Sequence, residues 1–176
     1  MRKHILLTGY PRTGKTTLLK EIIKDLDSCG GFYTEEIIQN NERTGFKIKT
    51  LDGREGILAK KDLESKYRLG KYGINIKDLE EISIEAIEEA LETKKIIIID
   101  EIGKMEFFSE KFKDITFRAL DSDKRVIGTI HRDLLGLVNQ RQDTEILQVN
   151  LNNHQEILSR CRSLLQNSST QKIKRI

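Results

Sequence analysis

The sequence has few of the residues that mark several large classes of protein. Of its 176 residues, two are cysteine, one is proline and none is tryptophan. Cys29 and Cys161 stand far apart, with no Cys-x-x-Cys motif and no histidine at ligand spacing. We therefore expect two free thiols in a reducing compartment rather than a disulfide framework or a zinc site. No apolar run approaches the roughly 20 residues that a membrane-spanning helix needs.

The charges of the chain nearly cancel. Charged residues make up 34% of the sequence, yet the formal net charge is only +3, as in a globular domain with a highly charged surface. A dedicated nucleic-acid binder would carry a strong basic excess, so the balance disfavours that class without excluding it. Residues 1–4 lead directly into an apolar segment too short for a signal peptide. We expect a cytoplasmic monomer that does not bind membranes.

Apolar periodicity alternates between that of strands and that of helices. Strands are predicted at Ile5–Thr8, Phe32–Ile38, Tyr72–Ile76, Ile96–Ile99, Arg125–Ile130 and Glu145–Leu151. Helices are predicted at Thr16–Leu26, Asp78–Thr93, Phe107–Leu120 and Arg132–Asn139, and after Asn153, which has Glu156 at the spacing of a capping box. Gly30 and Gly31 are expected to end the first helical region.

A β-hairpin interrupts this alternation at about residues 45–60. Phe46–Leu51 and Arg54–Lys60 would be its strands, and Asp52-Gly53 its turn. The β-branched run Ile96–Ile99 is typical of a central parallel strand that is buried on both faces. We predict one α/β domain over residues 1–166, with a mainly parallel sheet flanked by helices, and a flexible polar tail over residues 167–176.

One segment carries a phosphate-binding pattern. Gly9–Thr16 reads Gly-Tyr-Pro-Arg-Thr-Gly-Lys-Thr, with the spacing of a P-loop, between a predicted strand and a predicted helix. Backbone N–H groups and the positive end of the helix would surround the phosphates of a nucleoside triphosphate. Lys15 is expected to reach the β- and γ-phosphates, Thr16 to ligate Mg²⁺, and Thr17 to meet the α-phosphate.

An acidic pair follows the run Ile96–Ile99. At the carboxyl end of a parallel strand, Asp100 and Glu101 would lie beside the phosphate loop. Asp100 is expected to help hold Mg²⁺ indirectly, by orienting one of its ligands, or through a bridging water. Glu101 is expected to activate the water that attacks the γ-phosphate. Lys15 and Glu101 are therefore predicted to be catalytic. The residues predicted to bind nucleotide are Gly9, Tyr10, Pro11, Arg12, Thr13, Gly14, Lys15, Thr16, Thr17, Asp100 and Glu101.

Four further residues have two interpretations each. Arg132 could be a third catalytic residue, an arginine finger in the same chain, or could with His131 solvate a strand–helix junction. Thr129 could sense the γ-phosphate from a strand end, or only pack there. Arg12 could contact phosphate or point outward.

Two other clusters receive a structural interpretation. The glutamates of Asp78–Thr93 spread over one polar helix face, as expected of a solvated helix rather than a metal site. Phe107, Phe108 and Phe112 are expected in the core rather than on a base-stacking surface.

Several segments resemble a known family. In chain order they are the phosphate loop, Gly31–Glu36, Arg43–Phe46, Tyr72–Asn75 and the specific run Asp-Glu-Ile-Gly-Lys-Met-Glu over Asp100–Glu106. From about Ile5 to Ile130 the chain looks like the small nucleoside-triphosphatase family that includes the human cancer-related nucleoside-triphosphatase and its thermophile relatives. The resemblance implies a RecA-like P-loop NTPase fold and Mg²⁺-dependent hydrolysis of ATP, GTP and other nucleoside triphosphates to diphosphate and phosphate.

Base selectivity and two alternative functions stay open. Guanine-specific switches read the base with an Asn-Lys-x-Asp segment that this chain lacks, so we expect CTP and UTP to be used as well. A small nucleoside or nucleotide kinase is one alternative, because Glu42–Lys77 contains Arg43, Arg54 and Arg68, which could form a lid. The other is a nucleotide-dependent binding module in which slow hydrolysis acts as a timer.

Overall fold

The computed structural model describes residues 3–169, and the side chains of residues 3–166. Its strands are β1 (His4–Thr8), β2 (Cys29–Gln39), β3 (Glu42–Thr50), β4 (Glu55–Lys60), β5 (Arg68–Leu69), β6 (Tyr72–Ile74), β7 (Ile96–Ile102), β8 (Arg125–Ile130) and β9 (Thr144–Gln148). Its helices are α1 (Lys15–Lys24), α2 (Ile76–Asp78), the π-helical η1 (Leu79–Ile84), α3 (Glu85–Thr93), the 3₁₀-helical η2 (Glu106–Phe108), α4 (Glu110–Asp121), the 3₁₀-helical η3 (Arg132–Leu137) and α5 (His154–Ser169).

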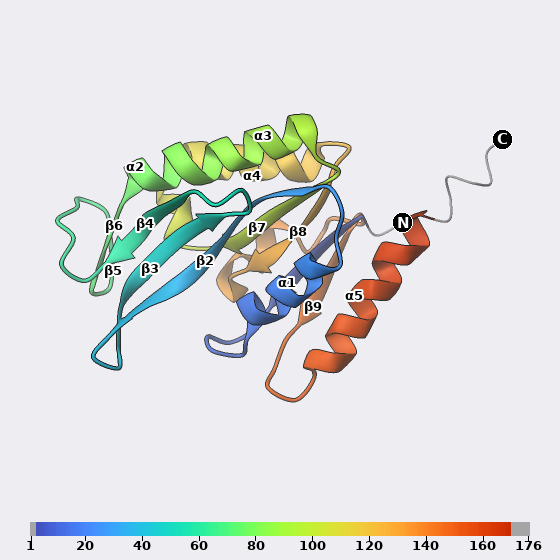
Figure 1. The fold of residues 1–176 in the computed structure, drawn as a ribbon, viewed down its shortest axis with the longest axis horizontal. Coiled ribbons are helices and arrows are strands. Elements are labelled where there is room, and N and C mark those ends of the chain that lie inside the picture. Colours follow the sequence, from blue (N-terminus) through green and yellow to red (C-terminus); the bar gives the residue numbers. More distant parts are fainter. Residues whose placement is uncertain (1–2, 170–176) are drawn as a thin grey trace.

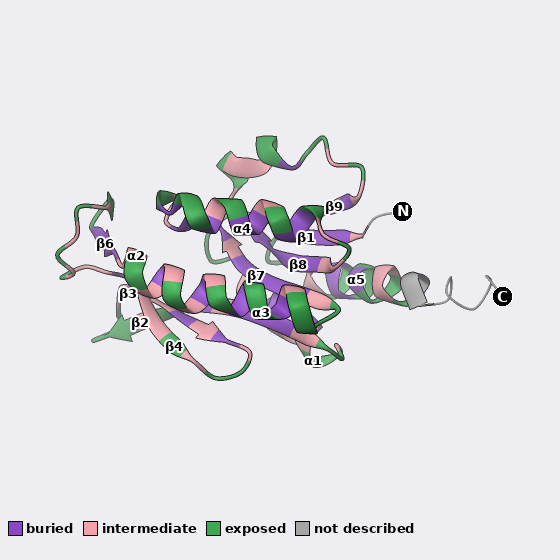
Figure 2. Cartoon of the chain, turned by 90° about the horizontal axis from the view of Figure 1, so that it is seen from above, coloured by how far each residue is buried: buried purple, intermediate pink, exposed green. Residues whose placement is uncertain are grey.

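The described strands form a nine-stranded sheet in the order β5-β6-β4-β3-β2-β7-β8-β1-β9 (Figure 1). From β2 to β9 all neighbours are parallel, and from β2 to β5 all are antiparallel. Helices flank both faces, with α3 and α4 on one and α1 and α5 on the other (Figures 1 and 2). The predicted α/β class is confirmed. The antiparallel part, which we call the sheet extension (β3–β6), is larger than the predicted hairpin.

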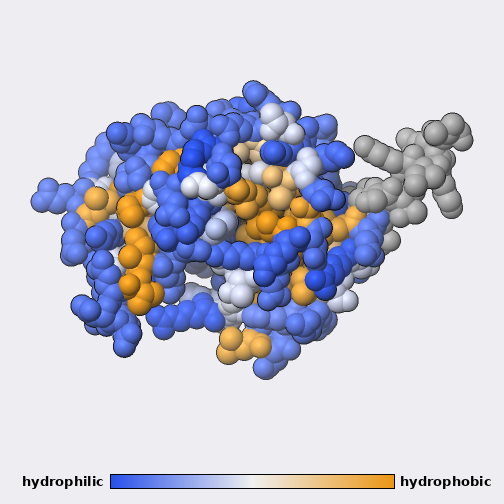
Figure 3. All heavy atoms as spheres, viewed as in Figure 1, coloured by the Kyte–Doolittle hydropathy of each residue, from blue (hydrophilic) through white to orange (hydrophobic). Residues whose placement is uncertain are grey.

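Alternation along β7 explains the two apolar cores. Ile97 and Ile99 belong to the core under α3 and α4, whereas Ile98 belongs to the core under α1 and α5. Successive side chains of a strand point to opposite faces, so an unbroken apolar run is what a strand covered on both sides requires. The outer surface is mainly hydrophilic in the view of Figure 3, as the high charged fraction predicts.

The prediction that Gly30 and Gly31 end a helical region is wrong. Both lie in β2, which pairs with β7, and α1 already ends at Lys24. A Cβ atom at Gly31, whose φ is 114°, would collide with the backbone carbonyl of Ile98. Glycine is therefore needed here because two central strands approach closely, not because a helix stops.

The predicted hairpin is confirmed but is not separate from the main sheet. β3 pairs antiparallel with β4, and the turn between them contains Asp52 and Gly53. β3 also pairs antiparallel with β2 from Phe32 to Gln39, while the start of β2 pairs parallel with β7. One strand thus joins the parallel half of the sheet to the extension.

Three predicted helices differ in detail from those observed. The helix predicted from Asp78 contains the π-helical turn η1. Its outward glutamates are exposed as expected, except Glu80, which is half-buried and accepts bonds from Ser109 and Lys111. Ser109 accepts a hydrogen bond from the backbone N–H of Phe112 and caps the start of α4. This cap separates α4 from η2. The helix predicted at Arg132–Asn139 is the shorter 3₁₀-helix η3.

The C-terminal helix begins after Asn153, as predicted. The Asn153 side chain, however, bonds to the backbone of Gln148 at the end of β9 and of Asn150 in the loop that follows. α5 continues through Ser169, into the segment predicted to be a polar tail, and residues 170–176 lie outside the described part.

The three phenylalanines predicted to be in the core have different surroundings. Phe112 is fully buried against Phe32, with ring centroids 5.9 Å apart, and Phe107 packs on the same core. Phe108 is 36% exposed, and its ring lies 5.8 Å from that of Tyr67. Phe108 is therefore a surface residue, because the break before Ser109 turns it away from the helix face that Phe112 occupies.

The described residues contain both cysteines and all the helices given above. Cys29 and Cys161 are both free thiols there. Within the same part of the chain, each helix is too short or too polar to cross a membrane.

Candidate active site

The phosphate loop joins β1 to α1, as predicted. Gly14 has a left-handed φ of 82° and precedes the first turn of α1. The Thr13 hydroxyl donates a 2.9 Å hydrogen bond to the carbonyl of Tyr10, which closes the loop on itself. Tyr10, Pro11 and Arg12 form its exposed tip. The amide N–H groups of the first α1 turn face the pocket with the positive end of the helix, an arrangement that suits phosphate.

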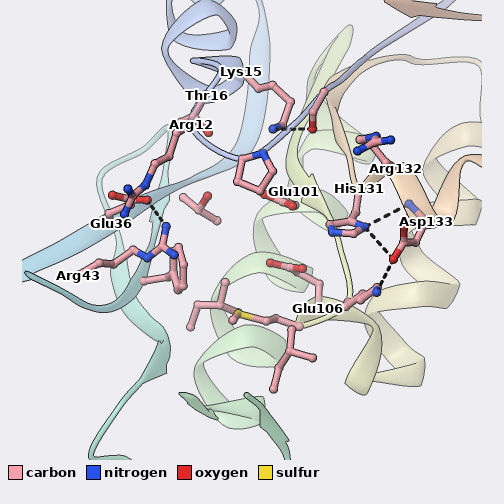
Figure 4. A pocket seen from close by; sticks show the side chains of 18 of the residues that line it. Arg12, Lys15, Thr16, Glu36, Arg43, Glu101, Glu106, His131, Arg132 and Asp133 are labelled. Carbon is pink, nitrogen blue, oxygen red and sulfur yellow. Dashed lines mark hydrogen bonds and ion pairs between the residues drawn. The ribbon is translucent and has the colours of Figure 1, made fainter. Parts of the chain in front are cut away.

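Lys15 lies folded over this loop. Its ammonium group donates hydrogen bonds of 2.9 Å to the Tyr10 carbonyl and 3.2 Å to the Gly9 carbonyl. The positive charge is thus held beside the loop amides, at the wall of the pocket that also contains Glu101 (Figure 4). A triphosphate in the loop would meet both kinds of donor at once.

Asp100 is the centre of a buried hydrogen-bond cluster. Its side chain is 0% exposed, and its Oδ1 accepts a 2.6 Å bond from the Thr129 hydroxyl. Its Oδ2 accepts a 2.9 Å bond from the Thr16 hydroxyl and a 3.3 Å bond from the backbone N–H of Thr34. Burial raises the pKa of Asp100, and the donors Thr129, Thr34 and Thr16 oppose this by stabilising the carboxylate. Three strands (β2, β7 and β8) and the phosphate-loop helix α1 therefore meet at one carboxylate.

The pairing of β7 with β8 is irregular where the two acidic residues lie. The register shifts between Ile99 and Ile102, so Asp100 and Glu101 sit in a bulge. In a regular strand, neighbouring side chains would point to opposite faces. A bulge redirects side chains, and here Asp100 turns into the buried cluster while Glu101 lines the pocket.

A second glutamate lies beside Glu101. Glu106, at the start of η2, is 3% exposed and points into the same cavity (Figure 4). A Cβ atom at position 103 would stand 2.5 Å from Glu106 Oε2 and 2.9 Å from Glu101 Cγ. Gly103 is therefore what allows the two carboxyl groups to approach each other.

Burial and mutual repulsion shift the titration of this pair. Burial first, and then the charge of Asp100, raise the pKa of Glu101 to about 7, although Lys15 opposes them. Burial and the neighbouring Glu101 raise the pKa of Glu106 well above its usual range. Of the three acids, Asp100 has the donors that stabilise a charge, whereas burial and the neighbouring Glu101 disfavour a charge on Glu106.

The site opens into a cavity of about 430 Å³. Its walls come from the phosphate loop, from β2 and the sheet extension, and from the segments at the ends of β7 and β8 (Figure 4). Its lining includes these predicted residues: Gly9, Pro11, Arg12, Gly14, Lys15, Thr16, Glu101 and Arg132. Thr17 is exposed on the first turn of α1, away from this lining. Of the open interpretations, Arg12 lies at the cavity wall, whereas the Thr129 hydroxyl is directed at Asp100.

Arg132 stacks on the phosphate loop. Its guanidinium carbon lies 3.9 Å from the centroid of the Tyr10 ring; both residues are exposed, and Arg132 also lines the pocket. Next to it, the His131 ring accepts a 3.2 Å hydrogen bond from the backbone N–H of Asp133, which caps η3. Arg132 therefore touches the loop, while His131 has the capping role of a strand–helix junction.

Comparison with known proteins agrees with this geometry. The sequence model of the family described as NTPase matches residues 4–161. The chain is 48% identical over 164 residues to the nucleoside-triphosphatase THEP1 of Thermotoga maritima, covering 92% of this chain and 94% of that protein. The chain belongs to this NTPase family.

Relatives further away share both sequence and fold. The cancer-related nucleoside-triphosphatase homolog of Mus musculus is 33% identical over 190 residues, which cover 97% of this chain and 100% of that protein. The crystal structure of THEP1 from Aquifex aeolicus superposes with a TM-score of 0.83 at 36% identity, covering 92% of this chain and 98% of that one. The resemblance noted from the sequence is thus confirmed, and with it the P-loop NTPase fold and the class of enzyme, a nucleoside-triphosphatase.

Two residues of the site in this member of the NTPase family were missed by reasoning from the sequence. Thr34 and Glu106 both stand in family-like segments, but neither has a motif spacing that assigns a role. Thr34 meets Asp100 only because β2 pairs with β7, and Glu106 meets Glu101 only because of the turn at Gly103. What the sequence offered for Glu106 was its place at the end of the family-like run Asp100–Glu106.

Proposed function

We propose that this member of the NTPase family hydrolyses ATP, GTP, CTP and UTP to the diphosphate and phosphate in a Mg²⁺-dependent reaction. The observation that carries the proposal is the 2.9 Å hydrogen bond from Thr16 to Asp100. It links the phosphate loop to the acidic strand end, and the next residue along the chain, Glu101, lines the pocket beside Lys15. Phosphate-binding groups and a candidate base thus share one cavity.

The donor chemistry at this link fits Mg²⁺. Thr16 and Asp100 offer only oxygen atoms, the ligands that this ion prefers, and it commonly keeps several waters. Asp100 is fully buried and already accepts bonds from three residues, which suits a carboxylate that holds Thr16 or a Mg²⁺-bound water in place. Thr16 would then be the direct ligand. Bound Mg²⁺ would offset the negative charge of the phosphate oxygens.

The protein groups would divide the remaining tasks. The backbone N–H groups from Gly9 to Thr17, other than at Pro11, which has none, and the Lys15 ammonium would hold the phosphate chain in line for attack. Glu101 would accept a hydrogen bond from the attacking water and take its proton as the bond to phosphorus forms. The pKa of about 7 for Glu101 suits a general base, since such a group works best when its pKa is near the working pH.

Arg132 would add positive charge from the other side of the loop. Its present position over Tyr10 places the guanidinium at the mouth of the pocket. An arginine that reaches the transferring phosphoryl group stabilises its charge, as an arginine finger does. We therefore retain Arg132 as a proposed catalytic residue.

The base is proposed to matter little for recognition. The polar groups gathered at the loop, namely its amides, Lys15, Thr16 and Glu101, are all suited to phosphate or water rather than to a base edge. Substrate use should then follow the triphosphate, which the four nucleotides share. The monomeric state and the cytoplasmic location predicted from the sequence are also kept as proposals.

One experiment tests the proposal directly. Phosphate release is measured with ATP, GTP, CTP and UTP, each with Mg²⁺ and with excess EDTA. We expect release from all four with Mg²⁺, at rates within about tenfold of one another, and little release with EDTA. Activity that persists in EDTA would contradict the metal requirement, and activity with one base only would contradict the broad specificity.

A further inference from the structure

The pocket has a second half that hydrolysis does not need. Beyond Glu101 its lining combines polar residues, among them Glu36 and Arg43, with four apolar ones: Phe46, Leu58 and Leu69 of the sheet extension and Met105 after β7. We call these four residues the acceptor lobe. Water and the γ-phosphate contact polar groups only, so an apolar wall of this kind has no task in the hydrolytic reaction.

The lobe lies beyond the γ-phosphate end of the proposed nucleotide. Along the loop, Thr17 is expected at the α-phosphate and Lys15 at the γ-phosphate, so the base and sugar of the nucleotide extend away past Thr17. Glu101 and Glu106 stand on the opposite side, between the loop and the lobe (Figure 4). The base of the nucleotide therefore does not fill the lobe.

Pairing within the extension builds the lobe wall. Glu36 pairs with Phe46 across β2 and β3, and Phe46 pairs with Ala59 across β3 and β4. Residues paired directly across neighbouring strands share one face of a sheet, and Thr34, two residues before Glu36, shares that face as well. The same face thus contacts Asp100 through Thr34, lines the pocket through Glu36 and contributes Phe46 to the lobe.

A fixed arginine equips the lobe for hydrogen bonding. Arg43 donates a 2.6 Å bond to Glu36 and a 3.3 Å bond to the Tyr72 hydroxyl, and its guanidinium lies 5.1 Å from the centroid of Phe46. Phe46 in turn contacts Tyr72 edge-on, with centroids 5.4 Å apart. A flat ring, an arginine and a glutamate held together offer stacking, donors and an acceptor to a planar ligand.

We propose that the acceptor lobe binds a nucleoside, and that a hydroxyl of this nucleoside takes the γ-phosphoryl group in place of water. The inference rests on the proposed function, because it uses the same phosphate loop and the same base. The planar heterocycle would lie against Phe46 and Arg43, and its sugar would face Glu101 and Glu106.

The transfer balances without any other reactant. The hydroxyl oxygen forms a bond to the γ-phosphorus, and the bond from that phosphorus to the β–γ bridging oxygen breaks. The hydroxyl proton goes to the Glu101 carboxylate, and the nucleoside diphosphate leaves. The products are the diphosphate and a nucleoside monophosphate. With the lobe empty, water attacks instead and the outcome is hydrolysis.

The test uses ATP labelled on the γ-phosphate, with the full chain and Mg²⁺. Adenosine, guanosine, cytidine, uridine and thymidine are added singly, and labelled phosphate and labelled monophosphate are separated. We expect at least one nucleoside to become labelled while phosphate release falls about tenfold or more, because the lobe then excludes water. No labelled product and no change in phosphate release with any of the five would overturn the inference. The five nucleoside monophosphates are added in a parallel series, and labelling of these alone would overturn the nucleoside class.

Two variants locate the transfer in the lobe. Leu69→Glu puts a charge into it, and Phe46→Leu removes the ring while keeping an apolar side chain. Both should lower the ratio of labelled nucleoside to released phosphate about tenfold, since a stacked, apolar contact of this kind contributes about 1–2 kcal/mol. Ile38→Glu, at an exposed position of β2 outside the cavity, is the matched control and should leave the ratio unchanged. A ratio that stays unchanged in both lobe variants, with folding checked by circular dichroism, would also overturn the inference.

Hydrolysis and transfer to a nucleoside are measured separately, so each can be absent without the other. Hydrolysis of ATP without any nucleoside, unaffected by all five, leaves the proposed function intact and removes the acceptor lobe. Transfer to a nucleoside without measurable hydrolysis would support the acceptor lobe and contradict the proposed hydrolysis.

Discussion

His154 Nε2 lies 2.6 Å from the backbone carbonyl oxygen of Thr13, so the first residue of α5 contacts the phosphate loop. A carbonyl can only accept, and Nε2 must therefore carry the proton of this hydrogen bond. The same ring also blocks the space beside Gly14, where a Cβ atom would lie 2.6 Å from His154 Cε1. The C-terminal helix thus holds the loop in shape, although no loop motif includes it.

His154→Ala should weaken nucleotide binding without removing catalysis. It deletes one hydrogen bond to the loop, worth about 1 kcal/mol, so we expect Kd for ATP to rise about fivefold. Isothermal titration calorimetry measures the effect, and Gln155→Ala, at the next and exposed position of α5, is the control. Equal affinities in the two variants would contradict the role of His154.

Glu101→Gln should separate binding from turnover. The amide keeps the size of the side chain but cannot take a proton, and general-base catalysis contributes about a hundredfold or more. We therefore expect an unchanged Kd for ATP and a fall in kcat of at least about a hundredfold. Glu92→Gln, on the exposed face of α3, should behave as the wild type. Unchanged phosphate release in Glu101→Gln would refute its assignment as the base.

Thr129→Val should destabilise the fold more than an ordinary buried threonine substitution. It removes the 2.6 Å donor to Asp100 and leaves a buried carboxylate with fewer partners, which costs about 1–3 kcal/mol. Thr116→Val is the control, because the buried Thr116 hydroxyl only donates to the Phe112 carbonyl of its own helix. Urea denaturation gives both free energies of unfolding, and Thr129→Ser should recover most of the loss. Equal losses for the two valine variants would contradict the prediction.

Arg132→Ala should lower kcat about tenfold or more while KM changes little, if the arginine acts on the transferring phosphoryl group. Arg132→Lys should recover only part, because the guanidinium has a donor geometry that an ammonium lacks. The matched control is Arg118→Ala, an exposed arginine of α4 paired with Glu88. A rise in KM with unchanged kcat would instead show that Arg132 only helps to bind nucleotide.

Acid should destabilise the protein through His4. The ring is fully buried, its Nδ1 accepts a 3.0 Å bond from the Val126 N–H, and burial lowers its pKa from 6.5 to about 4. Lys3 and Arg141 lower the pKa further, whereas Asp143, 3.5 Å from Nε2, opposes them. The folded-state pKa is thus below the unfolded value. Stability is complete above pH 6.5 and is lost as the pH falls from there towards 4, because only the unfolded chain takes up the proton.

The size of this loss follows from the two pKa values. Each pH unit between them corresponds to about 1.4 kcal/mol, so about 3 kcal/mol should disappear across the window. His4→Gln keeps an acceptor for the Val126 N–H but does not titrate. The difference in free energy of unfolding between wild type and this variant should shrink on acidification, measured by urea denaturation at several pH values. A difference that stays constant would contradict the assignment to His4.

Contacts between sequence neighbours were predictable, and contacts set by register were not. The loop and the pair Asp100-Glu101 each lie in one short segment, so strand and helix patterns were enough to bring them to the same edge of the sheet. Thr34 reaches Asp100 through the pairing of β2 with β7, which depends on the glycine at position 31. That glycine was misread as a helix end, because a glycine pair looks the same in a turn and at a close approach of two strands.

The acceptor lobe was invisible in the sequence for a related reason. Phe46, Leu58, Leu69 and Met105 come from four segments with no shared motif. Antiparallel pairing brings the strands of the first three together, and Met105 joins them from the turn after β7. The bulge at Asp100-Glu101 is likewise a property of pairing, since the shift appears only when β7 is aligned with β8.

β2 is shared by two pairings of opposite direction, parallel to β7 at its start and antiparallel to β3 beyond it. The phosphate loop and the acidic strand end lie on the parallel side of this strand, and most of the acceptor lobe lies on the other. Substitutions and insertions in the extension can therefore reshape what the pocket admits while the grip on the triphosphate stays the same. β2 thus divides the sheet into two parts. The parallel part holds the phosphate donor, and the sheet extension can vary with the acceptor that the pocket binds.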